Sequence, residues 1–261
     1  VLTTALIVFC VVPAVLATPC GNVDGTQINV ITSCLCGTNT CTSATGMYCA
    51  ASQNTCYQTQ RHSDCTFSDQ TTGTFTVSSP GCRLTKMITM TSGDGMVISG
   101  NATADPLHEL QAVGGPVTTS PKRHFDLQSG STLKLSYLRL SGGKTSTGHG
   151  NNGHGGSIRV NGNAATIVEV ISCIFSGCGI GIDCARHGGA LYVGNSAKAF
   201  ITLSIFENVN AYAIGAAIAI IHSAEVTISD TTFNSCNIGG NNNGHGAVIV
   251  QHQGKLHLNG G

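Results

Sequence analysis

Four short segments of this chain share one pattern of aliphatic residues at a spacing of about thirty residues. They begin 33, 27 and 30 residues apart, and a fifth segment, FDL at Phe125, occupies the same position one repeat earlier. The four segments are SIRV at Ser157, ALYV at Ala190, AIAI at Ala217 and AVIV at Ala247. A repeat of this length is typical of solenoids, in which each unit stacks on the next. No other feature of the sequence restricts the possible folds as strongly.

Two more sets of apolar residues follow each of these segments, so each repeat is expected to contain three short strands. The second set is LKL at Leu133, VEV at Val168, ITL at Ile201, VTI at Val226 and LHL at Leu256, and the third is centred on Leu140, Phe175, Phe206 and Phe233. With no helical crossovers, the pattern predicts an all-β, right-handed parallel β-helix over residues 84–261. A β-sandwich is the alternative fold, but it requires hairpin turns and does not explain the thirty-residue recurrence.

Alternation within the strands predicts which side chains face the core. Those expected to point inward are Ile158 and Val160, Leu191 and Val193, Ile218 and Ile220, Val248 and Val250, with Phe175, Phe206 and Phe233 stacked as an aromatic ladder. Those expected to point outward are Arg159, Tyr192, Ala219 and Ile249 in the first strand and Lys134, Glu169, Thr202, Thr227 and His257 in the second. This register predicts two solvent-exposed ion pairs between neighbouring coils, Asp126 with Arg159 and Lys134 with Glu169.

The composition agrees with a glycine-rich β protein and argues against two classes of partner. The 261 residues include 34 glycines and no tryptophan, and only 9% are charged. Twelve basic residues balance twelve acidic ones. This balance provides no electrostatic footprint for nucleic acid or for an anionic membrane.

The N-terminal segment, VLTTALIVFCVVPAVLA at residues 1–17, has the features of a secretory signal peptide. It is apolar, too short for a membrane span, and ends in compact residues that a signal peptidase accepts. A buried N-terminal strand is the alternative. The segment lacks an initiator methionine and a charged beginning, so we expect the chain to be incomplete at this end. A secretory signal predicts a secreted or cell-surface protein.

Residues 18–82 are predicted to form a small module held together by disulfides. An even number of closely spaced cysteines behind a signal peptide indicates a disulfide framework, because such a polar segment buries too little apolar surface to fold without covalent links. The candidate cysteines are Cys20, Cys34, Cys36, Cys41, Cys49, Cys56, Cys65 and Cys82. A zinc knuckle is the alternative, but paired CxxC elements are missing. The CLCGTNTCTSATGMYC segment also resembles cysteine-rich modules of predicted algal surface proteins.

The region from Arg123 to Gly261 resembles a known family. RHFDLQSGSTLKLSYLRLSGG, followed by GGALYV and SIFENV, is similar to the pectin-lyase-like right-handed β-helix and to the GGAI and FxxN repeats of polymorphic outer-membrane proteins. Gly215-Ala216-Ala217-Ile218 and Phe233-Asn234-Ser235-Cys236 depart from these repeats. The resemblance implies a β-helix that serves either as an adhesive surface element or as a carbohydrate-active enzyme.

The residues favour the adhesive alternative over the enzyme. The stretch GHGNNGHGG at residues 148–156 and the later GHG at 244–246 resemble the GHG motif of polygalacturonases, but the NTD, Asp-pair and RIK elements of that family are missing. The acidic residues are scattered, so neither an acid and base pair nor a cluster of aspartates for calcium is apparent. We therefore expect no catalytic residues and no cofactor, and a polysaccharide lyase or glycoside hydrolase is kept as the alternative.

The histidines of the glycine-rich stretches are interpreted as corner residues rather than as metal ligands. His154 and His187 each lie two residues before a repeat glycine, so they should occupy equivalent corners of neighbouring coils. A zinc or copper site needs three or four ligands, and the next corner holds Ile214. The prediction is that His149, His154 and His245 are exposed polar spacers and that the glycines provide the turn.

Three other features complete the sequence-based picture. Asn101 begins an Asn-Ala-Thr glycosylation sequon. The four later cysteines are Cys173, Cys178, Cys184 and Cys236, of which Cys184 is expected to pair with Cys173 or Cys178, unless these residues are small apolar core residues. The chain stops within a repeat, so we expect further coils or an anchor to follow. Together these features predict a surface-displayed protein that presents a repetitive surface to extracellular glycans or surface proteins.

Overall fold

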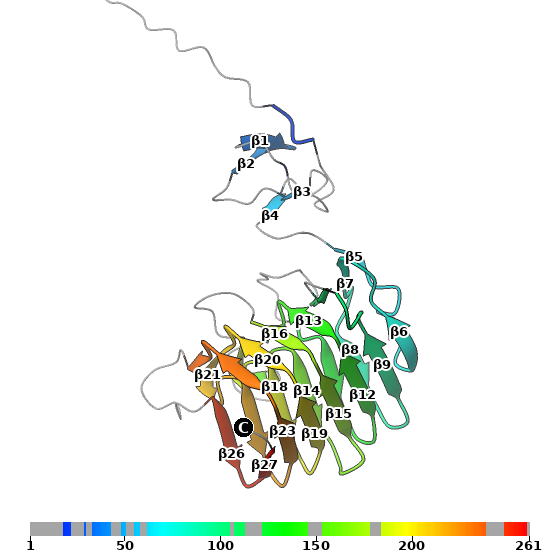
Figure 1. The fold of residues 1–261 in the computed structure, drawn as a ribbon, viewed down its shortest axis with the longest axis vertical. Coiled ribbons are helices and arrows are strands. Elements are labelled where there is room, and N and C mark those ends of the chain that lie inside the picture. The colour runs from blue at the N-terminus through cyan, green and yellow to red at the C-terminus, as the bar shows by residue number, and fades with distance from the viewer. Residues whose placement is uncertain are drawn as a thin grey trace, which may run out of the picture. The chain divides into compact units, whose positions relative to one another are not determined.

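Parallel sheets, stacked coil upon coil, make up most of the described chain (Figure 1). The computed structural model describes residues 18–21, 29, 33–42, 48–50, 55–57, 62–104, 107–112, 122–145, 153–177, 184–238 and 248–259. The signal peptide predicted for residues 1–17 lies outside these residues. The chain divides into two compact units, Val1–Arg61 and His62–Gly261, and each is described by itself below.

The second unit contains three long parallel sheets, and each coil contributes strands to them in the same order. Sheet 1 consists of β8 (Ile88–Met90), β11 (Phe125–Leu127), β14 (Ile158–Asn161), β18 (Leu191–Gly194), β22 (Ile218–Ile221) and β26 (Ile249–His252). Sheet 2 consists of β6 (Gly73–Thr76), β9 (Gly95–Ser99), β12 (Thr132–Ser136), β15 (Ile167–Ile171), β19 (Lys198–Thr202), β23 (Glu225–Ser229) and β27 (Lys255–Asn259). Sheet 3 consists of β5 (Ser63–Asp64), β7 (Gly81–Arg83), β10 (His108–Gln111), β13 (Leu138–Ser141), β16 (Ile174–Ser176), β20 (Ile205–Glu207) and β24 (Thr232–Asn234).

A fourth, smaller parallel sheet lies along the chain between sheet 3 and sheet 1 in the later coils. Sheet 4 consists of β17 (Ala185–His187), β21 (Asn210–Ile214) and β25 (Asn237–Ile238). The sequence pattern did not predict it, because its strands carry no repeated aliphatic alternation. All four sheets are parallel, which confirms the predicted parallel β-solenoid.

The register of sheet 1 follows the predicted repeat through the middle coils. Phe125 is aligned with Ile158, Ile158 with Leu191 and Leu191 with Ile218, and all four are fully buried. In sheet 3 the predicted aromatic ladder is present. The rings of Phe175 and Phe206 are stacked with centroids 4.7 Å apart, and those of Phe206 and Phe233 are 5.0 Å apart. One continuous apolar core therefore runs through the coils.

Two details of the predicted register are wrong. In β26 the residue aligned with Ile218 is Ile249 rather than Val248, and Val250 lies on the outward face beside Ala219. In β19 the residue aligned with Glu169 is Phe200 rather than Thr202. Both errors have the same origin, because each segment contains apolar residues at both possible registers and the sequence pattern cannot choose between them.

The boundary of the solenoid also differs from the prediction, which assigned residues 18–82 to the cysteine-rich module. Strands β5, β6 and β7 precede residue 84, yet they pair in parallel with later strands of sheets 2 and 3. The Cys65–Cys82 disulfide connects two of these coils, and Cys65 belongs to the solenoid core. The spacing of the cysteines does not reveal this boundary, because disulfide-bonded cysteines occur in both units.

The first unit contains two small antiparallel pairs, β1 (Ser33–Cys36) with β2 (Asn39–Thr42) and β3 (Tyr48–Ala50) with β4 (Thr55–Tyr57). Disulfides join Cys20 to Cys34 and Cys36 to Cys49, and Cys41 is also in a disulfide. The side chain of Cys56 lies outside the described residues. Among the described residues of this unit, the buried apolar cluster consists of cysteines, so disulfides stabilise a region whose described part has little other apolar packing.

The corners that lead into sheet 1 require glycine. Gly155, Gly188 and Gly215 precede successive strands and have φ values of +60°, +60° and +59°. A Cβ atom at Gly155 or Gly188 would lie 2.1 Å from a backbone carbonyl oxygen. The predicted role of the repeat glycines at these corners is confirmed.

Candidate functional site

His154 and His187 lie side by side at the corner before sheet 1, as the sequence predicted. They form an isolated parallel bridge, and their rings are stacked with centroids 4.9 Å apart. His187 is aligned with Ile214 on the following coil, which is the corner residue that the repeat indicated. Because glycine follows each histidine, the backbone turns directly after the imidazole. His149 and His245, the other histidines of the GHG stretches, lie outside the described residues.

The predicted exposure of His154 is wrong, because Tyr192 covers its ring. The two rings are stacked at a centroid distance of 4.3 Å. Tyr192 projects from the outward face of β18, and its ring lies over Gly194, where a Cβ atom would be 2.8 Å from the tyrosine Cε1. His154 is consequently half-buried and Tyr192 is buried. No sequence pattern predicts this contact, because His154 and Tyr192 belong to different coils and different structural elements.

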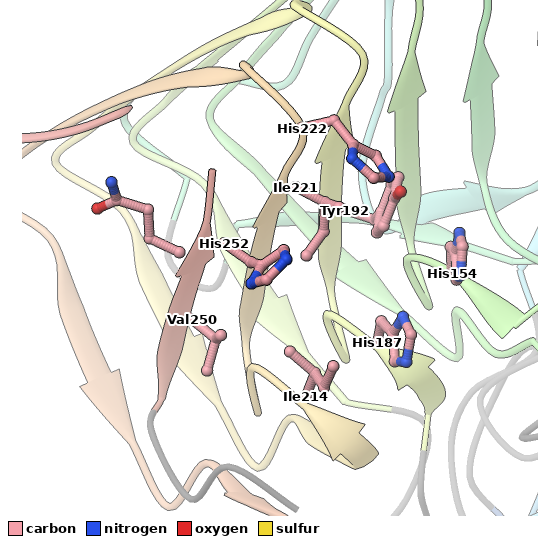
Figure 2. A pocket seen from close by; sticks show the side chains of 9 residues that line it. His154, His187, Tyr192, Ile214, Ile221, His222, Val250 and His252 are labelled. Carbon is pink, nitrogen blue, oxygen red and sulfur yellow. The ribbon is translucent and has the colours of Figure 1, made fainter. Parts of the chain in front are cut away.

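A cleft of about 470 Å³ extends from this stack across the outward face of sheet 1 (Figure 2). Its walls come from consecutive coils and include four imidazole rings, one phenol and one amide. The lining residues are His154, His187, Tyr192, Ile214, Ile221, His222, Val250, Gln251 and His252. Figure 2 shows His154 and His187 on one side of the cleft and His252 on the other. Among the described side chains that line it there is no carboxylate.

His222 and His252 are functional candidates that the sequence analysis missed. His222 follows β22 and His252 ends β26, and the backbone N–H of His222 donates to the carbonyl of His252 at 3.0 Å. The bend at His222 has a φ of +49°, as residues at this corner must turn sharply toward sheet 2. The sequence feature that could have identified His222 and His252 is that each directly follows or ends a repeat strand, whereas His154 and His187 precede one. Residues at the two ends of a strand share one face of a sheet only once the register is known.

His154 and Tyr192 are held in their neutral forms near neutral pH. Burial is the main cause that lowers the pKa of His154 to about 4, and the charges of His187, Arg159, Arg123 and Arg186 lower it further. Burial also raises the pKa of Tyr192, so its hydroxyl remains a hydrogen-bond donor. Neutral imidazole has one donor and one acceptor nitrogen, which suits hydrogen bonding with hydroxyl groups.

The predicted ion pair of Asp126 with Arg159 is present beside the cleft, but it is not exposed. Arg159 donates from Nε to Oδ1 of Asp126 at 2.6 Å and from Nη2 to Oδ2 at 3.1 Å. The two side chains are only 10% and 11% exposed, and Arg123 lies 3.8 Å from the same carboxylate. By contrast, the Lys134–Glu169 pair on sheet 2 is exposed as predicted, with a separation of 3.0 Å. The sequence predicted equal exposure for the two ion pairs, but the structure buries one and exposes the other.

A second polar cluster surrounds Glu109 on sheet 3. Its carboxylate accepts hydrogen bonds from Ser141 Oγ, from Gln111 Nε2 at 3.3 Å and from His62 Nε2 at 2.8 Å. The carboxylate lies between the hydroxyl and the imidazole, so His62 is not placed to take a proton from Ser141. In a catalytic triad the imidazole lies between the hydroxyl and the carboxylate, whereas here the carboxylate lies between the other two groups. The arrangement therefore indicates a structural hydrogen-bond network.

The remaining predicted site residues occupy positions consistent with a secreted protein. Asn101 is exposed in a turn, where its Oδ1 accepts from the N–H and hydroxyl of Thr103. The sulfur atoms of Cys20, Cys41 and Cys49 lie within 4.8 Å of one another, but all three belong to disulfides, so they offer no thiolates to zinc. Cys184 is also in a disulfide, whereas Cys173 and Cys236 are free thiols. Cys178 lies outside the described residues.

Comparison of the chain with protein-family models, with curated proteins and with solved structures finds no match. None of the described segments forms an apolar helix long enough to cross a membrane. The disulfides and the parallel β-solenoid together identify a repetitive protein suited to an oxidising, extracellular environment.

Proposed function

We propose that this protein is a secreted or cell-surface binding protein and that the cleft on sheet 1 is its glycan-binding site. The observation that carries the proposal is the cleft itself, a concave surface that spans neighbouring coils and is lined by aromatic, imidazole and amide side chains. Sugar rings expose both apolar C–H faces and hydroxyl groups, which such a lining can contact through stacking and hydrogen bonds. Adjacent coils repeat these contacts, so an extended glycan would gain affinity from several weak interactions.

The same geometry favours binding over the alternative of a carbohydrate-active enzyme. Hydrolysis of a glycosidic bond generally uses two carboxyl groups that flank it, and none occurs among the cleft-lining side chains that the structure describes. A lyase needs a base that is effective near the working pH, and burial makes His154 a weak one by lowering its pKa to about 4. Glu109 is engaged by three hydrogen bonds on a different sheet.

A glycan array combined with matched variants tests the proposal. We expect wild-type protein to bind a defined set of glycans, and His187→Ala or Tyr192→Ala to weaken that binding at least about tenfold, or roughly 1.4 kcal/mol. His257→Ala is the matched control, because His257 is an exposed histidine on sheet 2, away from the cleft residues. Equal binding by all four proteins would contradict the assignment of the cleft.

The glycans that bind are then incubated with the protein and assayed for new reducing ends and for unsaturated products. We expect neither product. Formation of either one by the wild type, with loss of the activity in His187→Ala, would replace the binding proposal with the enzyme alternative.

A further inference from the structure

Two turns of the solenoid begin with an asparagine and share the same hydrogen bonds. The first begins at Asn101, between β9 of sheet 2 and β10 of sheet 3, and the second begins at Asn163, between β14 of sheet 1 and β15 of sheet 2. In each turn the asparagine Oδ1 accepts from the backbone N–H two residues later, that of Thr103 or of Ala165, at 3.0 Å. The asparagine carbonyl accepts from the N–H three residues later, at 3.1 Å in the first turn and 2.9 Å in the second. The two turns are therefore matched in backbone and in side-chain amide geometry.

The two turns differ in one hydroxyl group. Thr103 Oγ1 also donates to Oδ1 of Asn101 at 3.0 Å, whereas the corresponding residue of the second turn is Ala165. Asn-Ala-Thr is a sequon for N-linked glycosylation and Asn-Ala-Ala is not. Asn101 is the only asparagine of the 261 residues that is followed by serine or threonine at the second position. The hydroxyl thus distinguishes a sequon from an otherwise equivalent turn.

The Asn101 turn rests on the neighbouring coil through the glycine that precedes it. The N–H of Gly100 donates to the carbonyl of Ser136 at 2.9 Å, and a Cβ atom at Gly100 would lie 2.1 Å from the carbonyl oxygen of Tyr137. The backbone is held against the solenoid at this point, but Asn101 and Thr103 are exposed. A transferase can therefore reach the amide on the folded chain.

The hydrogen bonds at Asn101 also suit its amide to react through nitrogen. The nitrogen lone pair of an amide is delocalised into the carbonyl group, so the nitrogen is ordinarily a weak nucleophile. Two donors on Oδ1 stabilise the negative charge that this oxygen acquires as Nδ2 gives up a proton. Both bonds use Oδ1, and the structure shows no hydrogen bond from Nδ2 to a described residue. The nitrogen is left open to a sugar donor.

We infer that Asn101 is the attachment site of an N-linked oligosaccharide and that the hydroxyl of Thr103 selects it over Asn163. The disulfides fit the oxidising compartment in which secreted proteins are glycosylated. The attachment site does not depend on the proposed function, because it lies at the corner between sheets 2 and 3, whereas the cleft lies on the outward face of sheet 1.

The donor is a lipid-linked oligosaccharide, and a transferase catalyses the step. A bond forms between Nδ2 of Asn101 and C1 of the first sugar as the bond between that carbon and the pyrophosphate oxygen breaks. The lipid pyrophosphate leaves with the electron pair of the broken bond, and the amide nitrogen loses one proton to a base of the transferase. The reaction is a group transfer and needs no oxidant or reductant.

Secretion of the chain from a eukaryotic host that glycosylates its proteins tests the inference. Peptide mass spectrometry, before and after treatment with peptide N-glycosidase, measures the fraction of chains modified at each asparagine. We expect most wild-type chains to carry a glycan at Asn101 and none to carry one at Asn163. Asn101→Gln should abolish the modification. Wild-type protein without a glycan at Asn101 would overturn the inference.

Matched variants of the two turns test the role of the hydroxyl. Thr103→Ser keeps a hydroxyl and should keep the glycan, whereas Thr103→Ala should lower the modified fraction at least about tenfold. Ala165→Thr supplies the missing hydroxyl to the second turn and should bring a glycan to Asn163. Thr103 and Ala165 are both exposed, so thermal unfolding should be unchanged in the three variants.

Ala165→Thr also shows whether the host modifies a turn of this construction. A glycan at Asn163 in this variant, together with an unmodified Asn101, would show that the first turn is not a site although the host is competent. An unmodified Asn163 in the same variant, or equal modification of Asn101 in Thr103→Ala and in the wild type, would show that the hydroxyl does not select the site. Asn101→Gln should bind a glycan array as the wild type does, so failure of the inference leaves the test of the cleft unaffected.

Discussion

Protonation of Glu109 and His124 determines how the solenoid responds to acid. Burial alone would raise the pKa of Glu109, but hydrogen bonds from His62 and Ser141 and the charge of His62 outweigh it and lower the pKa. Burial of the completely enclosed His124 lowers its pKa to about 4, and its Nε2–H donates to the Leu110 carbonyl at 3.0 Å. Both groups therefore stabilise the fold near neutral pH and lose that contribution in acid.

The His124 contribution is predicted to disappear between about pH 6.5 and pH 4. In this interval the unfolded chain binds a proton on the imidazole and the folded chain does not, so stability falls as the pH falls, by up to about 3 kcal/mol. The Glu109 contribution is lost at still lower pH, as that carboxylate is protonated in the folded state. Urea unfolding at pH 7.5, 5.5 and 4.0 measures this, and His124→Gln should show a smaller decrease than the wild type. Identical pH dependence in the two proteins would show that His124 is not buried in its neutral form.

Burial makes the two inter-coil ion pairs energetically different. Asp126→Asn leaves Arg159 enclosed without its charged partner, so we expect a loss of about 3 kcal/mol in the free energy of unfolding. Glu169→Gln removes the equivalent partner from the exposed Lys134 pair and should cost less than about 1 kcal/mol. Chemical denaturation of both variants provides the measurement. Similar small losses would mean that Asp126 and Arg159 are as accessible to water as the sheet 2 pair.

At the scale of the element, a strand of this solenoid is defined by what lies on the coils above and below it. Phe175, Phe206 and Phe233 occur in different repeats, yet they form one aromatic stack in sheet 3. Phe200 belongs to β19 in the same coil as Phe206, but it points outward and is 39% exposed. The same residue type therefore has different energetic roles on adjacent strands.

We expect Phe206→Ala to lower the free energy of unfolding by roughly 3 to 5 kcal/mol, because it leaves a cavity between two stacked rings. Phe200→Ala is the matched control and should cost less than about 1 kcal/mol, since its side chain is already partly in water. Denaturation midpoints for the two variants test the expectation. A midpoint for Phe206→Ala equal to that of the control would contradict the burial of the ladder.

At the scale of the whole molecule, the two units are stabilised by different means. Residues of the first unit enclose a core of disulfide-bonded cysteines, whereas the second has a continuous apolar core and backbone ladders along four parallel sheets. The Cys65–Cys82 disulfide lies within the second unit, where the coils that it joins are also stabilised by the apolar core. Reduction should therefore affect the two units unequally.

Hydrogen exchange with and without reductant tests this difference. Amides of β1, β2, β3 and β4 should lose protection when the disulfides are reduced, because little apolar burial remains to order them. Amides of sheets 1, 2 and 3 should retain protection, with the largest loss limited to the coils joined by Cys65 and Cys82. Uniform loss of protection throughout the chain would show that the two units are not independently stable.

The sequence by itself determined the parallel solenoid, the positions of its strands in the central coils, the aromatic ladder and the corner glycines. These features repeat at about thirty residues, and a repeated pattern identifies which residues must stack. It also brought His154 and His187 together, because both have the same offset from a repeat strand. It did not determine the register of β19 or β26, where apolar residues occupy two alternative positions.

Only the tertiary structure decided the burial of Asp126 and Arg159, the stacking of Tyr192 on His154, and the meeting of all four cleft histidines on one face. His222 and His252 follow their strands, whereas His154 and His187 precede theirs, so no single sequence spacing connects them. Alternation along a strand predicts the face that a side chain occupies, but burial also depends on side chains from neighbouring coils and corners. The cleft forms only when side chains from several coils and corners meet, and these contacts depend on the tertiary structure rather than on the local sequence.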